Sequence, residues 1–503
     1  MMKRDIMRIS FSHLTITTLP QLRGYSICIL FAILISLLSS CAVNPVTGSP
    51  ELMIYSDEQE VSMGQKAHPQ VVQEYGYYND RQIQDYVSAV GRRVSSHCER
   101  QSLNYHFTVI DAPILNAFAL PGGYVYVSRG LLAECNNEAQ LAAVIGHELG
   151  HVNGRHNMKR LQAALGMNIF SVAVGAATGS SAWQQVSGTL FGLIGQKYSR
   201  SQEREADDLG TRYTAMAGYD PGQMSSFLGR LRELHSQEPA GLEAIMASHP
   251  LTSERVTRTA FLASQLQKQY PRAIEINRQS YLQAIDGLQT GPDVRAGFVL
   301  GNTYTNSFCR IRFTIPAEMT LKPLKNGFIM TDSGKQELVF IYQEMERYLP
   351  PAVMADGFME KYATRLQAEE GITINQSAGI TRDYQVKNKQ GTWQQIKLAA
   401  FTGQDFGYLF LAFTPHASKP AFLQQHLAML SRQQAEKVNI PRLQIYTVRQ
   451  GDTLATIADH FFQSPAEAKN IAGYNGLGEE YPAHKSLPTG MQLKIIPAYG
   501  RDT

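Results

Sequence analysis

Two histidines separated by three residues give this 503-residue chain its clearest capacity for metal chemistry. The motif His147–His151 reads His-Glu-Leu-Gly-His. On a helix, positions i and i+4 lie on one face, so both imidazoles can bind one metal ion, and Glu148 is close enough to accept a proton from a metal-bound water. The ordinary alternative is a surface helix that happens to carry two histidines. Apolar residues that precede the motif indicate a packed helix instead: Leu141, Val144 and Ile145.

A catalytic metal site of this kind also needs a third protein ligand and one open position. Glu203 and Asp207, within the stretch Ser199–Asp207, are four residues apart and share one face of a second expected helix. Glu203 is the candidate ligand, and Asp207 is the candidate acceptor for the ring N–H of a ligand histidine. A single acidic residue on a helix usually belongs to a solvated face, so both assignments depend on the histidine motif.

The elements that must position these residues can be read from periodicity and caps. A helix is expected from Glu138 to about Gly154, with Asn137 as N-cap and Gln140 three residues later, as in a capping box. A second helix is expected from Ser199 to Gly218. The remaining expected elements of this part are a helix followed by a short β portion with a Pro-Gly-Gly turn: Gln82–Val94, Tyr105–Ile110, Ala117–Leu120 and Tyr124–Ser128.

In combination, these stretches resemble the HtpX and Ste-type zinc metallopeptidases (family M-48), and within that family the periplasmic BepA/LoiP-like lipoprotein branch. The resemblance runs from about residue 44 to residue 258, and no motif position departs from the family pattern. It rests on five separate stretches: Asn44–Gly48, Asn116–Gly123, His147–His156, Glu203–Asp207, and His249-Pro250 with Arg255.

The resemblance implies a mainly α, zincin-type (gluzincin) metallopeptidase domain with a small β-sheet. It implies one Zn²⁺ per chain, bound by His147, His151 and Glu203, the first glutamate of the Glu-x-x-x-Asp stretch. In such a site Glu148 is the general base that moves a proton from the attacking water to the leaving amine. Asp207 is then the outer partner of a ligand histidine.

Other residues near these motifs have roles that the sequence leaves open. A developing oxyanion needs a donor besides the metal, and His249 or Arg255 could supply it. His249 could instead cap the zinc in a resting state or be a structural histidine, and His156 is expected to be structural because it lies off the metal-binding face. An extended substrate is expected to add as a further strand along an edge formed by Asn116, Ala117, Phe118, Ala119 and Leu120.

The first 40 residues predict export and a lipid anchor. An apolar run, Tyr25–Leu38, follows a basic stretch, and Ser39-Ser40-Cys41 comes next, which resembles a bacterial lipobox. A retained membrane anchor is the alternative, although the run is short for a bilayer span. We therefore expect residues 1–40 to be a signal peptide and Cys41 to carry a lipid such as palmitate. Ala42, which is not Asp, implies by the family-level sorting rule the outer membrane of a Gram-negative cell envelope.

Charge and cysteine content exclude further classes of protein. The formal net charge is +3, and the first 40 residues hold four basic residues against Asp5, which already accounts for +3. The remaining chain is near neutral, so no nucleic-acid partner is indicated. With Cys28 removed and Cys41 acylated, three cysteines remain, and they have neither a disulfide framework nor metal-ligand spacing: Cys98, Cys135 and Cys309. One bridge among them is left open, and the sequence does not say which.

The chain divides into a tether (41–56), a metallopeptidase domain (57–288), an α+β domain of unassigned role (298–437) and a small βααβ domain (443–498). Apolar residues fill Leu161–Ile194, where buried helices are expected rather than a membrane-touching or substrate-contacting lid. In the α+β domain, helices are expected at Val353–Glu369 and Lys419–Lys437. The strands expected there are Ile311–Ile315, Gly327–Thr331, Leu338–Tyr342 and Gly407–Phe413.

The final unit resembles a LysM module in two stretches, Tyr446–Leu454 and Pro488–Pro497. LysM modules bind N-acetylglucosamine-containing glycans, which would make peptidoglycan a partner. The segment Gly478–Ser486 is longer than usual for such modules, so a purely structural role is the alternative. The glycan-binding candidates are Gly451, Asp452, Thr453 and Asn475.

Three functions follow as hypotheses. The first is a lipid-anchored zinc endopeptidase that acts on unfolded or misassembled envelope proteins. The second is a chaperone or assembly factor for outer-membrane proteins, whose binding groove matters more than cleavage. The third is a peptidoglycan-associated remodelling enzyme. The complete ligand set favours hydrolysis, since a protein that only binds has no use for Glu148.

Overall fold

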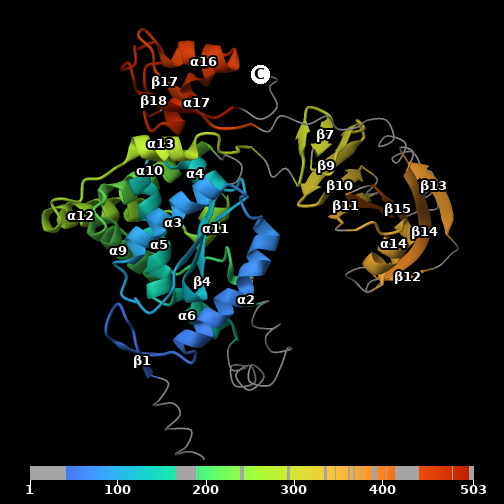
Figure 1. Ribbon diagram of the computed structural model, residues 1–503, viewed down its shortest axis with the longest axis horizontal. Helices are drawn as coiled ribbons and strands as arrows, with labels where there is room; N and C mark the ends of the chain where they lie inside the picture. The colour runs from blue at the N-terminus through green and yellow to red at the C-terminus, as the bar shows by residue number, and fades with distance from the viewer. Residues whose placement is uncertain are drawn as a thin grey trace, which may run out of the picture.

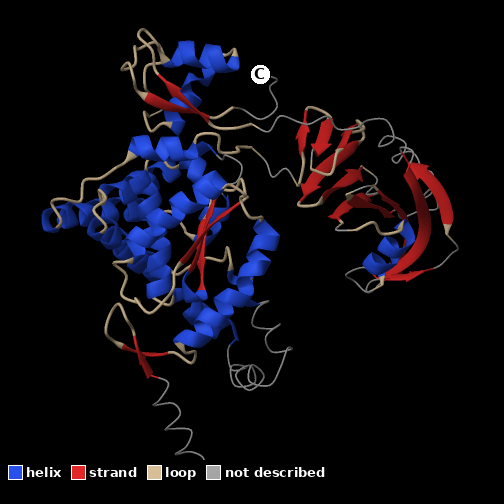
Figure 2. Cartoon of the chain, in the orientation of Figure 1, coloured by secondary structure: helices blue, strands red, loops and turns tan. Residues whose placement is uncertain are grey.

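The structure is a computed structural model of the chain (Figure 1). It describes residues 41–165, 189–190, 192–237, 243–291, 295–306, 308–333, 337–345, 347–360, 363–365, 369–374, 377–387, 393–403, 405–413, 441–478 and 480–497. A helix-rich part comes first, a sheet-rich part follows, and a small mixed unit ends the chain (Figure 2). Among the described residues, no helix combines the length and apolar character needed to cross a bilayer.

The helix-rich part surrounds a three-stranded sheet. The sheet order is β3-β5-β4, with β3 parallel and β4 antiparallel to the central strand β5. The strands are β3 (His106–Ile110), β4 (Ala117–Leu120) and β5 (Tyr124–Ser128). The helices are α2 (Asp57–Tyr75), α3 (Arg81–Ser95), α4 (Arg129–Glu134), α5 (Glu138–Asn153), α6 (His156–Leu165), α9 (Arg200–Met216), α10 (Gly222–Gln237), α11 (Glu243–Ser248), α12 (Ser253–Gln269) and α13 (Arg278–Ile285).

Sequence patterning predicted the three strands and the helices α3, α5 and α9 to within one or two residues. The predicted strands at 117–120 and 124–128 are confirmed without change, and α3, β3, α5 and α9 are confirmed with small shifts at their ends. The Asn137 side chain caps α5 by accepting from the Gln140 amide at 2.8 Å. In a full capping box the Gln140 side chain would also accept from the backbone amide of Asn137. Here it accepts from the amide of Asn136 instead, so Gln140 holds the segment that precedes the helix. At α9, Ser199 and Gln202 do form the full reciprocal box.

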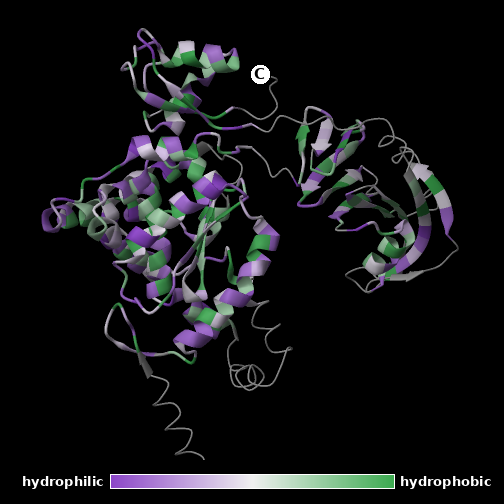
Figure 3. Cartoon of the chain, viewed as in Figure 1, coloured by the Kyte–Doolittle hydropathy of each residue, from purple (hydrophilic) through white to green (hydrophobic). Residues whose placement is uncertain are grey.

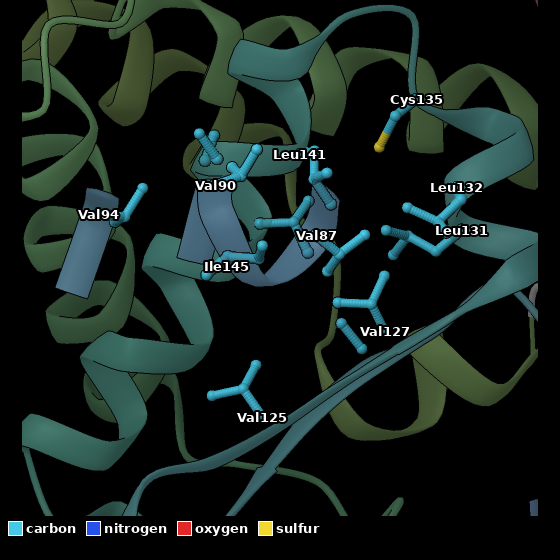
Figure 4. Packing of buried hydrophobic residues seen from close by; sticks show 14 of the residues in the cluster. Val87, Val90, Val94, Val125, Val127, Leu131, Leu132, Cys135, Leu141 and Ile145 are labelled. Carbon is cyan, nitrogen blue, oxygen red and sulfur yellow. The ribbon is translucent and has the colours of Figure 1, made fainter. Parts of the chain in front are cut away.

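One hydrophobic core lies between α3, the sheet, α4 and α5. Figure 4 shows side chains from all four converging: Val87, Val90, Val94, Val125, Val127, Leu131, Leu132, Cys135, Leu141 and Ile145. The strands β4 and β5 are buried along their whole lengths, and hydrophobic residues accordingly colour the strands of the small sheet in Figure 3. Helix α5 is buried at all 16 of its positions. The predicted packed helix is therefore the centre of the domain.

The N-terminal segment, predicted as a tether, carries local order. Strand β1 (Cys41–Val43) pairs antiparallel with β2 (Pro50–Leu52). Between them Asn44 is buried, and its side-chain oxygen accepts from the amides of Val46 and Thr47 at 2.8 and 3.0 Å. Lys159 of α6 forms an ion pair with Glu51 at 2.8 Å. Hydrogen bonds and an ion pair thus hold the path from Cys41 into the domain.

The sheet-rich part contains an eight-stranded antiparallel sheet with the path β12-β14-β15-β16-β11-β10-β9, to which β13 adds beside β14. The strands are β9 (Met319–Leu324), β10 (Gly327–Asp332), β11 (Glu337–Glu344), β12 (Ala363–Arg365), β13 (Glu370–Ile374), β14 (Ser377–Lys387), β15 (Trp393–Thr402) and β16 (Phe406–Phe413). A separate sheet, β6-β7-β8, precedes it and consists of Phe298–Leu300, Thr303–Asn306 and Ile311–Thr314.

One expected helix of this part is shorter than predicted. Helix α14 covers Pro351–Met359, and Ala363–Arg365, which was expected to continue the helix, is strand β12 and pairs with β14. The sheet edge offers backbone hydrogen bonds that override a weak helical preference. The helix predicted at 419–437 lies outside the described residues, as does most of the apolar stretch 161–194.

The final unit has the expected element order of strand, helix, helix, strand. It consists of β17 (Gln444–Thr447), α16 (Leu454–Phe462), η3 (Pro465–Glu467), α17 (Ala468–Tyr474) and β18 (Gln492–Ile495). The two strands pair antiparallel, and the helices pack on them through a core of their own. In Figure 1 this unit lies against α13 and the neighbouring helices of the first part.

Three cysteines in the described part of the chain are unpaired. Cys98, Cys135 and Cys309 are free and buried. Burial raises the pKa of the Cys135 thiol to about 12 and also raises the pKa values of the other two thiols. The sequence left open one bridge among these three cysteines, and the structure shows none.

Candidate metal centre

Helices α5 and α9 bring the two halves of the predicted site together by packing almost backbone to backbone. A Cβ on Gly150 would lie 2.9 Å from the Cα of Ala206, and a Cβ on Gly210 would lie 2.6 Å from the amide nitrogen of His147. A Cβ on Gly146 would lie 2.9 Å from the carbonyl oxygen of Gly210. Only glycine permits so close an approach. The seam therefore places Glu203 of α9 directly opposite the histidines of α5.

Four side chains converge at this seam, and all four are buried: His147, His151, Glu203 and His249. One potential ligand atom from each lies within 4.8 Å of the others. Nε2 of His147 is 3.1 Å from Nε2 of His151 and 3.2 Å from Nδ1 of His249. The Glu203 carboxylate is 3.4 Å from Nε2 of His151 and 2.9 Å from Nδ1 of His249.

This spacing fits a tetrahedral metal ion. With Zn–N bonds of 2.0–2.1 Å, two ligand nitrogens at tetrahedral positions are about 3.3 Å apart. The nitrogen separations of 3.1 and 3.2 Å are close to that value. Imidazole and carboxylate donors are also the types that Zn²⁺ prefers in catalytic sites. The structure therefore brings the predicted ligands His147, His151 and Glu203 together at a spacing that one ion would fit, with His249 beside them.

Asp207 and Arg255 hold the ligands from behind. Oδ1 of Asp207 lies 3.0 Å from Nδ1 of His147, on the ring side away from the ligand cluster. Arg255 donates to both carboxylate oxygens of Asp207 at 2.8 Å and pairs with Glu203 at 2.7 Å. The guanidinium therefore neutralises two buried carboxylates at once. Asp207 contacts a ligand histidine, as the sequence predicted. Arg255, a candidate oxyanion donor, contacts the carboxylates of Asp207 and Glu203.

Glu148 lies beside the cluster without joining it. Its Oε1 is 3.6 Å from Nε2 of His249, and its Oε2 is buried with no hydrogen-bond partner in the described part of the chain. Burial raises the pKa of this carboxyl, and the nearby histidines oppose the shift. A raised pKa brings a carboxylate closer to the range in which a general base works at neutral pH.

The ligands themselves are held in their binding forms. Burial keeps the pKa of His151 well below its usual range, so its imidazole is neutral and can bind a metal. Burial acts to raise the pKa of Glu203, but His249, His151 and His147 outweigh burial and keep that pKa well below its usual range. The site thus presents a neutral imidazole and an ionised carboxylate to the ion.

A further histidine that supports the ligands was missed at the sequence level. Nδ1 of His156 lies 2.8 Å from Nδ1 of His151, and Nε2 of His156 lies 3.2 Å from Glu205. His156, which the sequence predicts to be structural, lies outside the group of four potential ligands and contacts one of them. The α5 helix ends at Asn153, and Arg155 takes a left-handed conformation with φ 51°, so the chain turns back and the helical-face argument no longer applies to His156.

Tyr198 was also missed. Its ring stacks on the His151 imidazole with centroids 3.8 Å apart, and its hydroxyl donates to Asn157 at 2.6 Å. Asn157 in turn donates to the carbonyl of Ala119 in β4 at 2.9 Å. The residues therefore connect the predicted edge strand to a ligand histidine. A small cavity lies between them and is lined by Phe118, Ala119, Leu120, Asn157, Tyr198 and His249.

The four glycan candidates do not share one surface. Gly451 is exposed, and Thr453 is the N-cap of α16. Asp452 accepts from the Tyr446 hydroxyl and the Arg449 amide, both at 2.7 Å. Asn475 is only 5% exposed and is bonded to the backbone of Lys494. Asn475 thus faces the inside of the unit, and the other three residues lie nearer its surface.

Two histidines from one helix, a glutamate from a second helix and an adjacent unliganded glutamate are the arrangement found in HExxH metallopeptidases. Residues 81–260 match Peptidase family M48. This part of the chain therefore belongs to peptidase family M48.

Curated relatives match part of the chain. The beta-barrel assembly-enhancing protease of Escherichia coli (strain K12) is 29% identical over 237 residues, which cover 44% of this chain and 47% of that protein. Mitochondrial metalloendopeptidase OMA1 of Schizosaccharomyces pombe is 31% identical over 222 residues, with 42% and 64% covered. Metalloprotease LoiP of Escherichia coli (strain K12) is 30% identical over 172 residues, with 34% and 66% covered. The chain spans about half the length of the assembly-enhancing protease.

Proposed function

We propose that this chain is a zinc metalloendopeptidase that cleaves unfolded or misassembled proteins of the cell envelope. The observation that supports it best is the position of Glu148, a buried carboxylate with one oxygen free of hydrogen bonds among the described residues, beside four converging ligand atoms. A site that only stored metal would gain nothing from a buried, unpaired carboxylate, which is costly to maintain.

The proposed chemistry uses few residues. When bound by His147, His151 and Glu203, zinc would lower the pKa of a water ligand and polarise the scissile carbonyl. Glu148 accepts the proton of the attacking water and returns it to the leaving amine, so no net proton is gained or lost. Asp207 and Arg255 keep the His147 ring and the Glu203 carboxylate in place.

The class of substrate follows from the strand that borders the site and from the relatives. Among the described strands, β4 has β5 on one side only, so an extended polypeptide could add along its other edge. The name of one relative, the beta-barrel assembly-enhancing protease, refers to β-barrel assembly. The test compares release of peptides from an unfolded β-barrel protein with release from isolated peptidoglycan. Cleavage of the protein alone supports the proposal, and release of crosslink peptides alone supports the remodelling alternative.

We further propose that His249 caps the metal in a resting state. Its Nδ1 lies 3.2 Å from Nε2 of His147 and 2.9 Å from the Glu203 carboxylate, so on a bound ion it would occupy the position that the attacking water needs. Arg255, the other candidate oxyanion donor, is occupied by Asp207 and Glu203. The cap must leave before water enters, so the resting site is closed.

His249→Ala should therefore increase hydrolysis of an unfolded substrate. If the cap is present in about 70–90% of molecules, its removal raises the competent fraction and the rate by roughly 3- to 10-fold. Zinc content should stay near one per chain, because three ligands remain. His484→Ala, at an exposed histidine of the final unit, is the control. A fall in kcat with zinc retained would instead assign His249 to oxyanion stabilisation.

Lipid attachment at Cys41 is the basis for proposing an envelope location. Cys41→Ser should abolish incorporation of labelled fatty acid and leave the precursor unprocessed, because the thiol is the acylated group. Cys28→Ser, within the same leader, should process normally and serves as the matched control. Normal processing of the Cys41 variant would mean an ordinary signal peptide or a retained anchor.

A further inference from the structure

Lys494 of β18 is a fully buried lysine at the contact between the final unit and the helix-rich part. Its side chain is 0% exposed. The ammonium donates to the carbonyl oxygens of Ala133, Glu134 and Cys135 at 2.9, 3.2 and 2.8 Å. These three carbonyls belong to the end of α4 and its C-cap. A residue near the C-terminus of the chain thus holds a helix end about 360 residues earlier in the sequence.

In this contact the three N–H donors of the Lys494 ammonium meet three carbonyl acceptors. The last carbonyls of a helix have no partner within the helix, and a lysine ammonium has three donors and no acceptor. Burial lowers the pKa of Lys494 to about 7, with Glu134 and Cys135 acting in the opposite direction. A buried ammonium is costly unless its hydrogen bonds are made, and here three carbonyls make them.

A second cation holds the same connection from the other side. Arg278 of α13 donates to the carbonyl of Asn136 at 2.7 Å, to Oδ1 of Asn475 at 3.1 Å and to the carbonyl of Gln492 at 3.3 Å. Asn475 is itself bonded to both backbone groups of Lys494, at 2.8 and 2.9 Å. Residues 133–136 are therefore held between the final unit and α13.

That connection leads directly into the helix that carries the metal ligands. The amide of Asn136 donates to Gln140 of α5 at 2.7 Å, and Asn137 is the N-cap of α5. His147, Glu148 and His151 follow on the same buried helix. A second route leads through Glu134, which pairs with Arg230 of α10 at 2.7 Å. Helix α10 contributes Met224, Phe227, Leu228 and Leu231 to a cavity that also contacts His147 and Glu148.

We propose that Lys494 is a positioning residue for the metal centre. Through the carbonyls of residues 133–135 it fixes where α5 begins, so the geometry of the ligands depends on a side chain supplied by the final unit. This unit then acts as an internal brace of the site, separate from any glycan binding. The inference rests on the proposed function where turnover is concerned, but the brace itself does not require catalysis.

The test uses the full-length protein carrying Lys494→Met, which keeps an apolar stem and removes all three donors. Lys469→Met, at an exposed position of α17 in the same unit, is the matched control. Metal affinity is measured by competition of Zn²⁺ between the protein and a chelator, and Co²⁺ absorption reports ligand geometry. We expect Lys494→Met to weaken Zn²⁺ binding by roughly 2- to 30-fold, the range for a substitution acting along a contact network. The kcat should fall and KM should change little.

A readout independent of zinc and catalysis separates this inference from the proposed function. Hydrogen exchange of metal-free protein should be faster over residues 133–145 in Lys494→Met than in Lys469→Met. If the lysine variant does not fold, Arg278→Gln removes the bonds from the other side and should act in the same direction. Equal exchange and equal Zn²⁺ affinity in the folded variants and the control would overturn the proposal. Absence of hydrolysis in the wild-type chain would overturn only the proposed function.

Discussion

Glu148→Gln should abolish most hydrolysis while leaving the metal in place. Glutamine keeps the size and hydrogen-bonding shape of the side chain but cannot accept the water proton. We expect the rate on an unfolded protein substrate to fall by at least about 10²-fold, the lower end for loss of general acid–base catalysis. Zinc content should remain about one per chain, because Glu148 lies outside the ligand set.

The same variant separates the peptidase from the chaperone hypothesis. If the chain is a chaperone that needs only its groove, the Glu148→Gln protein should complement a deletion strain; if it is a peptidase, the variant should fail and retain uncleaved substrate. Gln140→Glu is unsuitable as a control because Gln140 bonds the start of the same helix. Glu318→Gln, at an exposed glutamate of the sheet-rich part, is a better match. Cleavage at the native rate by the Glu148→Gln protein would end the catalytic assignment whatever its zinc content.

Loss of either motif histidine should empty the metal site. His147→Ala and His151→Ala each remove one of the three proposed permanent ligands. His249, the proposed cap, would have to leave for water to enter, so each variant keeps only two permanent ligands, which is too few for a stable catalytic site. Purified variants should contain much less than one zinc per chain by elemental analysis, and hydrolysis should be lost with the metal. Stoichiometric zinc in both variants would mean that the ion is bound elsewhere.

Graded effects are expected at the two carboxylates of α9. Glu203→Gln should weaken zinc binding strongly, because it replaces a charged ligand with a neutral one. Asp207→Ala should weaken it by about 10- to 100-fold, as for other outer partners of ligand histidines. The difference arises from position: Glu203 faces the nitrogen cluster, whereas Asp207 contacts the far side of the His147 ring at 3.0 Å. Equal zinc affinities for the two variants, measured by chelator competition, would contradict this division of roles.

The parts of the site that could be predicted were those governed by helical spacing. His147, His151, Glu203 and Asp207 lie at i and i+4 within single helices, so local geometry fixes which side chains share a face. That the two helices meet was supplied by the family resemblance. The structural reason, glycines at positions 146, 150 and 210, is visible in the sequence, but which glycines face a neighbouring helix is not.

Contacts that depend on chain reversal or on distant segments could not be predicted. His156 reaches His151 only because Arg155 takes a left-handed conformation, and Lys494 reaches α4 across most of the chain. No local pattern encodes either contact. The helix expected at 353–369 was predicted too long for the same reason: a distant segment decides the structure. Strand β12 forms within that range because β14 provides a strand edge to pair with.

The three buried thiols require that folding be faster than thiol oxidation. Thiol–disulfide exchange requires an accessible thiolate, and in the folded chain Cys98, Cys135 and Cys309 are buried with raised pKa values. If the chain is exported as proposed, it enters an oxidising compartment with all three thiols exposed. Folding and thiol oxidation then compete kinetically. A non-native disulfide at Cys135 would keep this residue out of the core, and the neighbouring carbonyl groups would no longer be in place for Lys494. Rapid folding of the helix-rich core would therefore protect Cys98 and Cys135 from oxidation better than later reduction of a non-native disulfide.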